Sequence, residues 1–304
     1  MSKRVLITGG SGFIGRNCLD RFVRRGYDVH AVAGSRPGDD EPGITWSQAN
    51  LLDLDQIAGI VADARADTLL HLAWMVKPGE AYTSPENFSW VSASMELIQQ
   101  FVHHGGRRVV AAGTCYEYDH SLGWCHEQRT PTNPDTVYGT CKNTLRQLAS
   151  AYCHTAGVSF AWPRIFFLYG PHEHPNRLVS SVIRSLLNGE AAKCSHGRQL
   201  RDYLYVEDLA DALVALCESD VENEINIASG QPVTLAKIVS RIGCLMERPE
   251  LVLLGALPCR GSEAPLVAAD TTLLRERLGW NPRHKLDESL RSTIAWWQAQ
   301  LQPA

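Results

Sequence analysis

Tyr138 and Lys142, four residues apart, could together move a proton at neutral pH. On a helix this spacing places both side chains on one face. A free tyrosine titrates near ~10, and an ammonium group a few ångströms away stabilises its phenolate. We therefore predict that Tyr138 is a general acid or base whose pKa is lowered by Lys142. The same spacing occurs by chance in many helices, so the prediction depends on what surrounds the pair.

Thr114 lies 24 residues before Tyr138, just after the apolar run Val109–Ala112. If that run is a strand, the Thr114 hydroxyl stands at its end, where it could bind the same substrate oxygen and stabilise developing charge. A threonine there can also simply cap a loop. Cys115 and Tyr116 follow directly and are predicted to contact substrate. Because no paired base is evident, we interpret Cys115 as a small pocket-lining residue and not as a nucleophile.

A glycine-rich loop, Thr8–Gly15, follows the first apolar run of the chain. Glycines three residues apart let the backbone turn tightly and approach a pyrophosphate held at the N-terminus of a helix. An apolar run before the loop and an amphipathic segment after it supply the strand and the helix that such a site needs. The predicted contacts to a dinucleotide are Gly9, Gly12, Phe13, Ile14 and Gly15.

The end of the second predicted strand bears on the choice of cofactor. An acidic residue there would bind the ribose hydroxyls of NAD, whereas an arginine would pair with the 2′-phosphate of NADP. The chain has Ala33, Gly34, Ser35 and Arg36 at this point. We predict that Ser35 and Arg36 bind that phosphate, so NADP is favoured and NAD is the alternative.

These segments need a sheet that brings the ends of strands together. Short apolar runs alternate with longer amphipathic segments, a pattern typical of βαβ units on a parallel sheet. Ligands bind at the carboxyl ends of such strands. The sequence predicts a helix at Phe13–Arg25 and strands at Arg4–Ile7, Asp28–Ala33, Leu69–Leu72 and Arg108–Ala112.

The regular pattern loosens after about residue 165, where prolines separate helical segments. We predict a doubly wound parallel α/β (Rossmann) sheet in residues 1–165, with a returning part near 198–228. Residues 166–304 are expected to form a smaller, partly interleaved substrate-binding domain.

Composition narrows the classes of partner. The 304 residues include 29 Lys and Arg against 33 Asp and Glu, without a long basic block, so we expect no nucleic-acid partner. No stretch approaches the ~18 apolar residues of a membrane helix, and we expect no membrane partner. Nine cysteines without a CxxC pair are typical of reduced thiols in a cytoplasm. His172–His174, flanked by prolines and lacking a second ligand pair, is interpreted as a solvated loop, and we predict no metal site.

Together these motifs resemble the extended short-chain dehydrogenase/reductase superfamily, specifically its nucleotide-sugar epimerase, dehydratase and ketoreductase group. The resemblance covers nearly the whole chain and is much more specific for the superfamily than for one reaction. Besides the glycine loop, Thr114 and the Tyr138/Lys142 pair, it rests on the segments His71–Trp74, Phe167–Pro171, Gly197–Asp208, Ile225–Gly230 and Leu278–Pro282.

The resemblance implies further site residues. It implies that Lys142 also holds the nicotinamide ribose, and that the cofactor is contacted by Asn50, Leu51, Leu72, Ala73 and Trp74. It implies substrate contacts at Phe167, Arg177, Leu178, Arg201 and Arg260. Arginine's planar guanidinium suits phosphate oxygens, so Arg201 and Arg260 are the candidates for a diphosphate. Arg201 could instead form an ion pair with its neighbour Asp202.

Departures from the family's sequence pattern narrow the set of reactions that the resemblance implies. The 4,6-dehydratases carry Asp-Glu after the threonine, where this chain has Cys115 and Tyr116. A conventional 4,6-dehydratase is therefore disfavoured, unless Glu117 or Asp119 reaches the substrate. Phe167 and Trp90 stand where many members of the family have asparagine.

We therefore expect an enzyme that reduces the 4-keto group of a nucleotide-activated (6-deoxy)hexose with NADPH. The alternative is a 4-epimerase with tightly bound NAD, and a third hypothesis is a dinucleotide sensor without catalysis. The family also implies a homodimer built through helices at Glu86–His103 and Thr136–Ala156.

Overall fold

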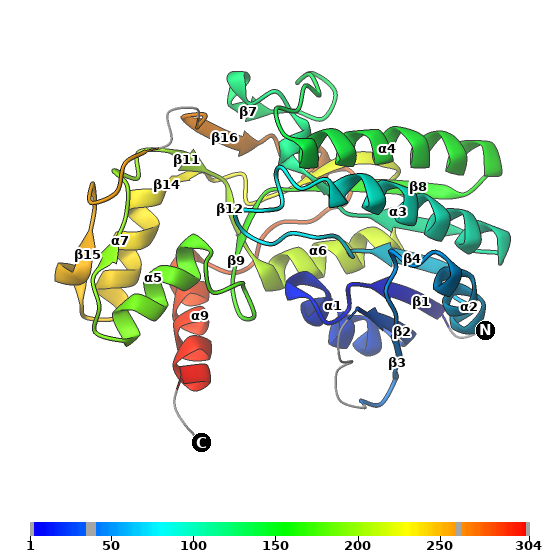
Figure 1. Cartoon of the computed structure of the whole chain (residues 1–304), viewed down its shortest axis with the longest axis horizontal. Coiled ribbons are helices and arrows are strands. Elements are labelled where there is room, and N and C mark those ends of the chain that lie inside the picture. Colours follow the sequence, from blue (N-terminus) through cyan, green and yellow to red (C-terminus); the bar gives the residue numbers. More distant parts are fainter. Residues whose placement is uncertain (1–2, 35–40, 260–262, 302–304) are drawn as a thin grey trace.

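The computed structural model describes residues 3–34, 41–259 and 263–301. Its main feature is a parallel sheet in the order β13-β8-β5-β4-β1-β2-β3, with the short β6 beside β8 (Figure 1). This confirms the predicted doubly wound fold. The strands are β1 (Lys3–Thr8), β2 (Tyr27–Ala33), β3 (Ile44–Gln48), β4 (Thr68–His71), β5 (Arg108–Ala111), β6 (Gly113–Thr114), β8 (Ser159–Ile165) and β13 (Asn223–Ile227).

Helices cover both faces of this sheet (Figure 1). One layer contains α1 (Phe13–Arg24) and α6 (Val206–Glu218), and the other contains α2 (Asp55–Ala64), α3 (Glu86–His103) and α4 (Val137–Ala156). Successive side chains of a strand point to opposite faces. In β1, Val5 and Ile7 accordingly join the first core, whereas Leu6 joins the second.

The smaller part of the molecule packs around a core of its own. Its main helices are α5 (Leu178–Leu187), α7 (Leu235–Leu245) and α9 (Leu286–Leu301), which bury apolar side chains against one another. The remaining elements are short: β7 (Trp124–Cys125), β9 (Phe167–Tyr169), β10 (Ala192–Lys193), β11 (Leu200–Arg201), β12 (Tyr203–Tyr205), β14 (Val233–Thr234), β15 (Val252–Leu253), β16 (Leu266–Ala269), α8 (Thr272–Glu276), η1 (Cys115–Glu117), η2 (His120–Leu122) and η3 (Pro249–Leu251).

Asp202 fastens three of these segments together. Its buried carboxylate accepts hydrogen bonds from the backbone N–H groups of Ser229 at 2.8 Å, Gly230 at 3.0 Å and Ala269 at 3.3 Å. The link joins the β11–β12 connection to the ends of β13 and β16. Asp202 is therefore occupied by the backbone and does not pair with Arg201.

The predicted elements differ from the structure mainly at their ends. Helix α4 begins at Val137 because Thr136 is its cap, with Oγ1 accepting from Gly139 N at 3.0 Å. The two-residue strand β6, which carries Thr114, was not predicted, since two residues show no periodicity. Within the described residues, none of the helices has the length and apolar character needed to span a membrane.

Candidate active site

The glycine loop forms a cradle that side chains would fill. Gly12 N donates to Gly9 O at 2.9 Å, and Gly9 has φ of 71°, a conformation that favours glycine. A Cβ on Gly15 would lie 2.2 Å from Gly9 O, and one on Gly9 would lie 2.9 Å from Ala73 N. The loop therefore leaves bare backbone at the N-terminus of α1, which fits a dinucleotide pyrophosphate.

A buried hydrogen-bond chain fixes the neighbouring loop after β4. Thr8 Oγ1 accepts from Leu72 N at 3.2 Å and Ala73 N at 3.3 Å, and it lies 2.6 Å from His71 Nδ1. His71 Nε2 lies 2.8 Å from Ser94 Oγ on α3. Burial, followed by the charge of Lys142, lowers the pKa of His71 to about 3. His71 is thus a neutral structural group.

Three other predicted cofactor residues lie in the loops after β3 and β4. Trp74 is buried and donates from Nε1 to Asn87 Oδ1 at 2.8 Å. Leu51 is buried and Asn50 is exposed in the loop after β3, where Asn50 Oδ1 accepts from Leu52 N at 3.1 Å. Ser35 and Arg36 lie outside the described residues, and so does Arg260.

Lys142 lies on the same helix as Tyr138 and is almost completely buried. Its Nζ donates to Ala112 O at 2.9 Å and lies 3.8 Å from the centroid of the Trp74 ring. Burial lowers the pKa of Lys142 to about 7, and the carboxylate of Glu117 opposes that change. The apolar, aromatic surroundings of Lys142 therefore destabilise its charged form.

Tyr138 is partly buried, and desolvation raises its pKa above the ordinary value, although hydrogen bonding with the Thr114 side chain acts in the opposite direction. The predicted lowering of this pKa by Lys142 is wrong for this structure. The reason is geometric, since the ammonium is turned to Ala112 O and the Trp74 ring. The catalytic roles of Tyr138 and Lys142 stay predictions.

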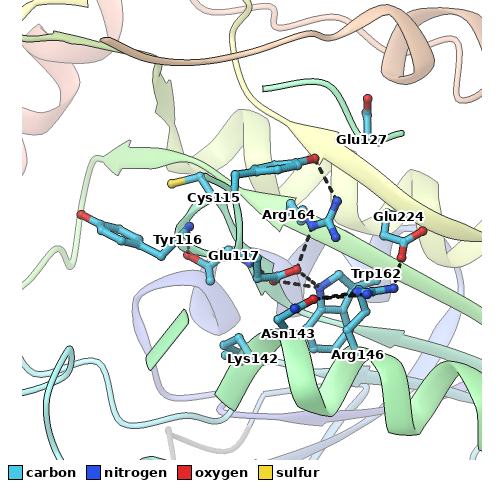
Figure 2. Close-up of polar contacts among 12 residues, drawn as sticks. Cys115, Tyr116, Glu117, Glu127, Lys142, Asn143, Arg146, Trp162, Arg164 and Glu224 are labelled. Carbon is cyan, nitrogen blue, oxygen red and sulfur yellow. Dashed lines mark hydrogen bonds and ion pairs between the residues drawn. The ribbon is translucent and has the colours of Figure 1, made fainter. Parts of the chain in front are cut away.

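Thr114 begins a tight turn, and the carboxylate of Glu117 in this turn points into the protein interior. Thr114 Oγ1 accepts from Tyr116 N at 3.3 Å, and Thr114 N donates to Glu117 Oε1 at 2.8 Å, which together form a capping box. Glu117 is completely buried and is paired with Arg164 (Figure 2). Asp119 instead accepts from Ser121 N at 2.9 Å. Glu117 is therefore not placed to protonate a substrate, and Asp119 caps η2.

Aromatic rings line the space beside Tyr138. Tyr82 donates from its hydroxyl to that of Tyr116 at 3.0 Å, and the centroids of the two rings lie 6.1 and 6.2 Å from that of Tyr138. Phe167 lies 6.3 Å from Tyr116. Sequence reasoning missed Tyr82 because it belongs to no motif and precedes α3 in an irregular segment.

The predicted phosphate ligand Arg201 lies against this aromatic group. Its guanidinium carbon is 5.5 Å from the Phe167 centroid, and Nη1 donates to Leu200 O at 2.9 Å. Cys115 is buried, and desolvation raises the pKa of its thiol well above the usual range. That environment disfavours a thiolate, whereas a pocket-lining role of Cys115 stays a prediction.

A cavity of about 520 Å³ lies beside α5. Leu178 and Gln199 line it, and Gln199 Nε2 donates to Glu263 Oε2 at 2.7 Å at its edge. Arg177 is the exposed cap residue of α5. The structure therefore brings Leu178 to a cavity large enough for part of a nucleotide, whereas Arg177 lies at its margin.

Glu173 departs from the interpretation of His172–His174 as a solvated loop, whereas His172 and His174 are exposed, as that interpretation expects. The Glu173 side chain is buried and accepts a hydrogen bond from Ser180 Oγ at 2.7 Å. His172 stacks on Trp296, with 4.7 Å between ring centroids. The turn after Gly170 directs Glu173 toward α5, which sequence spacing does not reveal.

The fold and the site define a class of protein, a dinucleotide-binding α/β enzyme with a threonine, a tyrosine and a lysine beside the cofactor cradle. The chain matches the model of the NAD dependent epimerase/dehydratase family over residues 5–228. It therefore belongs to this family of enzymes, whose members act on nucleotide sugars.

Individual relatives are distant but extend over most of the chain. UDP-glucuronic acid decarboxylase 1 of Danio rerio is 26% identical, with 99% of this chain and 74% of the relative covered. dTDP-6-deoxy-L-talose 4-dehydrogenase (NAD(+)) of Aggregatibacter actinomycetemcomitans is 25% identical, with 77% and 87% covered. The structure of MoeE5 in complex with UDP-glucose and NAD has a TM-score of 0.85 and 28% identity, with 98% and 100% covered.

Proposed function

We propose that this protein is a ketoreductase that transfers hydride to the 4-keto carbon of a nucleotide-activated hexose. The observation that carries the proposal is the burial of Glu117 against Arg164, next to Thr114. The family's 4,6-dehydratases carry the acid and the base for elimination of water directly after the threonine. Because Cys115 and Tyr116 occupy those positions and Glu117 is sequestered, the site favours hydride transfer at a carbonyl over elimination.

The residues divide the reaction between them. The nicotinamide ring, when bound, supplies the hydride. Tyr138 donates its phenolic proton to the substrate oxygen, so that a C–H and an O–H bond replace the carbonyl π bond. Thr114 orients that oxygen, and its hydrogen bond with Tyr138 stabilises the phenolate that forms, while Lys142 would hold the nicotinamide ribose. The proton returns to Tyr138 from solvent.

The substrate would lie across the two parts of the molecule. Tyr82 and Tyr116 contact the sugar beside Tyr138, and Arg201 binds the diphosphate. The cavity beside Leu178 takes the nucleotide. Support comes from the relatives, whose names state UDP- and dTDP-linked sugars.

NADP is the preferred cofactor in this proposal, and the printed sequence supports it. No carboxylate occurs in Ala33–Arg36, and Ser35 and Arg36 would bind the 2′-phosphate. NAD is the alternative, favoured by the family's name and by the NAD bound to MoeE5. With NAD held tightly, the same residues would perform a 4-epimerisation by oxidising and re-reducing the sugar.

One experiment separates these reactions. The purified protein is denatured and the released cofactor is measured, and the native protein is then given dTDP-4-keto-6-deoxyglucose with NADPH or NADH. We expect little released cofactor and loss of absorbance at 340 nm with NADPH. Stoichiometric NAD, together with interconversion of 4-epimers without net NADPH oxidation, would instead establish the epimerase. The Tyr138→Phe variant is the control, since it should bind cofactor and lose turnover.

A homodimer through α3 and α4 is also proposed. The two helices pack side by side, and Phe88 and Leu148 are 60% and 47% exposed on them. Burying such side chains in a second copy would stabilise the pair. Light scattering at micromolar concentration should give about twice the mass of 33.6 kDa, and a monomer would contradict the proposal.

A further inference from the structure

Glu117 accepts several hydrogen bonds (Figure 2) and closes the turn that begins at Thr114. Its Oε1 accepts from Thr114 N at 2.8 Å and from Trp162 Nε1 at 2.9 Å. Its Oε2 accepts from Arg164 Nε at 2.7 Å. The side chain is completely buried, so all these donors come from the protein itself.

The backbone makes room for this arrangement at Gly113. A Cβ there would lie 2.2 Å from Trp162 Nε1 and 2.8 Å from Glu117 Oε1. No side chain fits at those distances. The glycine therefore lets the carboxylate and the indole approach the strand that carries Thr114.

The far end of the network is anchored on other strands. Arg164, on β8, donates from Nη1 to the Tyr118 hydroxyl at 2.9 Å, and Tyr118 donates to Asn226 Oδ1 at 2.8 Å. Asn226, on β13, donates to Cys125 O at 2.9 Å. Thr114 is thus tied through one carboxylate to side chains on β8 and β13, the two neighbouring strands at one edge of the sheet.

A buried ion pair is weak evidence of stabilisation, because apolar residues of equal volume often stabilise a fold as well or better. The Glu117–Arg164 pair lies where the backbone N–H of Thr114 must be held for its hydroxyl to meet the substrate oxygen. A displacement of about 1 Å at such a group can lower a rate about 10²-fold.

We propose that Glu117 is a positioning residue, which aligns the Thr114 hydroxyl with Tyr138 without touching substrate. The inference rests on the proposed function, in which Thr114 orients the reacting oxygen. The proposal predicts that kcat depends on a hydrogen-bond acceptor for Thr114 N and not on the charge of the Glu117 side chain.

Two double variants separate these effects. Glu117→Gln with Arg164→Met and Glu117→Met with Arg164→Met both remove the ion pair, but only glutamine retains an oxygen for Thr114 N. With dTDP-4-keto-6-deoxyglucose as the probe, we expect the glutamine variant to keep kcat within about threefold of wild type. The methionine variant should lose about 10- to 100-fold in kcat, with KM changed less than about threefold. Equal losses in both variants would overturn the proposal.

Adding Thr114→Ala to each double variant tests whether Glu117 acts through Thr114. In that background the difference between glutamine and methionine should fall below about twofold. If the difference in kcat persists undiminished, Glu117 does not act through Thr114. Glu224→Gln is the control and should leave kcat unchanged, because Glu224 forms an ion pair with Arg146 and makes no hydrogen bond to Glu117 (Figure 2).

A second readout does not need a substrate. Hydrogen–deuterium exchange of the peptide covering residues 112–118 should be faster in the methionine variant than in the glutamine variant. Equal exchange would overturn the proposal even if turnover were found. If the wild-type protein turns over no nucleotide sugar, the proposed function fails, and exchange still decides whether Glu117 holds the turn.

Discussion

Replacing Glu173 by glutamine should make the stability of this protein less dependent on pH. The Glu173 carboxyl is only 5% exposed, and one oxygen accepts from Ser180 Oγ at 2.7 Å. Burial raises its pKa from 4.5 to about 7, and hydrogen bonds from Ser180 and the charge of Arg177 only partly oppose this. Glutamine has nearly the same shape and carries no proton to release.

The direction of this pH dependence follows from the pH at which the unfolded and the folded states release the Glu173 proton. The unfolded chain loses it near pH 4.5, whereas the folded protein keeps it to about pH 7. The stabilisation from the neutral carboxyl is therefore complete below pH 4.5 and is lost as pH rises to about 7. Each pH unit in this interval changes the free energy of unfolding by about 1.4 kcal/mol, giving about 3 kcal/mol in all.

The assay is urea unfolding of wild type and Glu173→Gln at several pH values. Between pH 5 and pH 8 the free energy of unfolding of wild type should fall by about 2 to 3 kcal/mol relative to the variant. Glu190→Gln, at an exposed position just after α5, is the control and should follow wild type. A constant difference between wild type and Glu173→Gln across this range would refute the reasoning.

Three further substitutions test other parts of the structure. Gly15→Ala should weaken NADPH binding at least about 10-fold in a fluorescence titration, because the alanine Cβ would lie 2.2 Å from Gly9 O. Unchanged affinity would exclude the glycine loop as the binding site of the cofactor. Lys142→Met should lower turnover more than about 100-fold. It should also unfold at a higher urea concentration than wild type at pH 6, because burial lowers the lysine pKa from 10.5 to about 7, and the cost of the buried charge grows as pH falls through this interval and is complete at pH 6. Asp202→Asn should cost about 2 to 3 kcal/mol in urea unfolding, since the amide replaces a charged acceptor of three backbone N–H groups; a loss below about 0.5 kcal/mol would contradict that role.

Predictions from the sequence were most accurate where residues close together in the chain determine the local structure. The glycine loop and the helix after it are specified by neighbouring residues, and so is the pairing of Tyr138 with Lys142 on α4. The layers of the sheet follow from apolar runs such as Val5–Ile7. Each of these signals is contained within a few residues, so no tertiary contact was needed to find it.

Sequence reasoning failed where a side chain finds its partner far along the chain. Glu117 meets Arg164 and Trp162 across 47 and 45 residues, and His71 meets Thr8 across 63. The effect of Lys142 on the pKa of Tyr138 was misjudged for the same reason, because the contact of Lys142 with Trp74 depends on the packing of α4 against the loop after β4. Burial of Glu173 likewise depends on how α5 folds back over its turn.

The distribution of thiols allows one position of the protein to be labelled selectively. Seven of the nine cysteines are buried, and only Cys244 and Cys259 are exposed. Cys259 lines the cavity beside Leu178. After Cys244→Ser, a maleimide dye would attach at a single place, at the mouth of the proposed nucleotide site, and its emission would report occupancy in real time. The same chemistry would let candidate nucleotides be ranked by competition before any substrate is known.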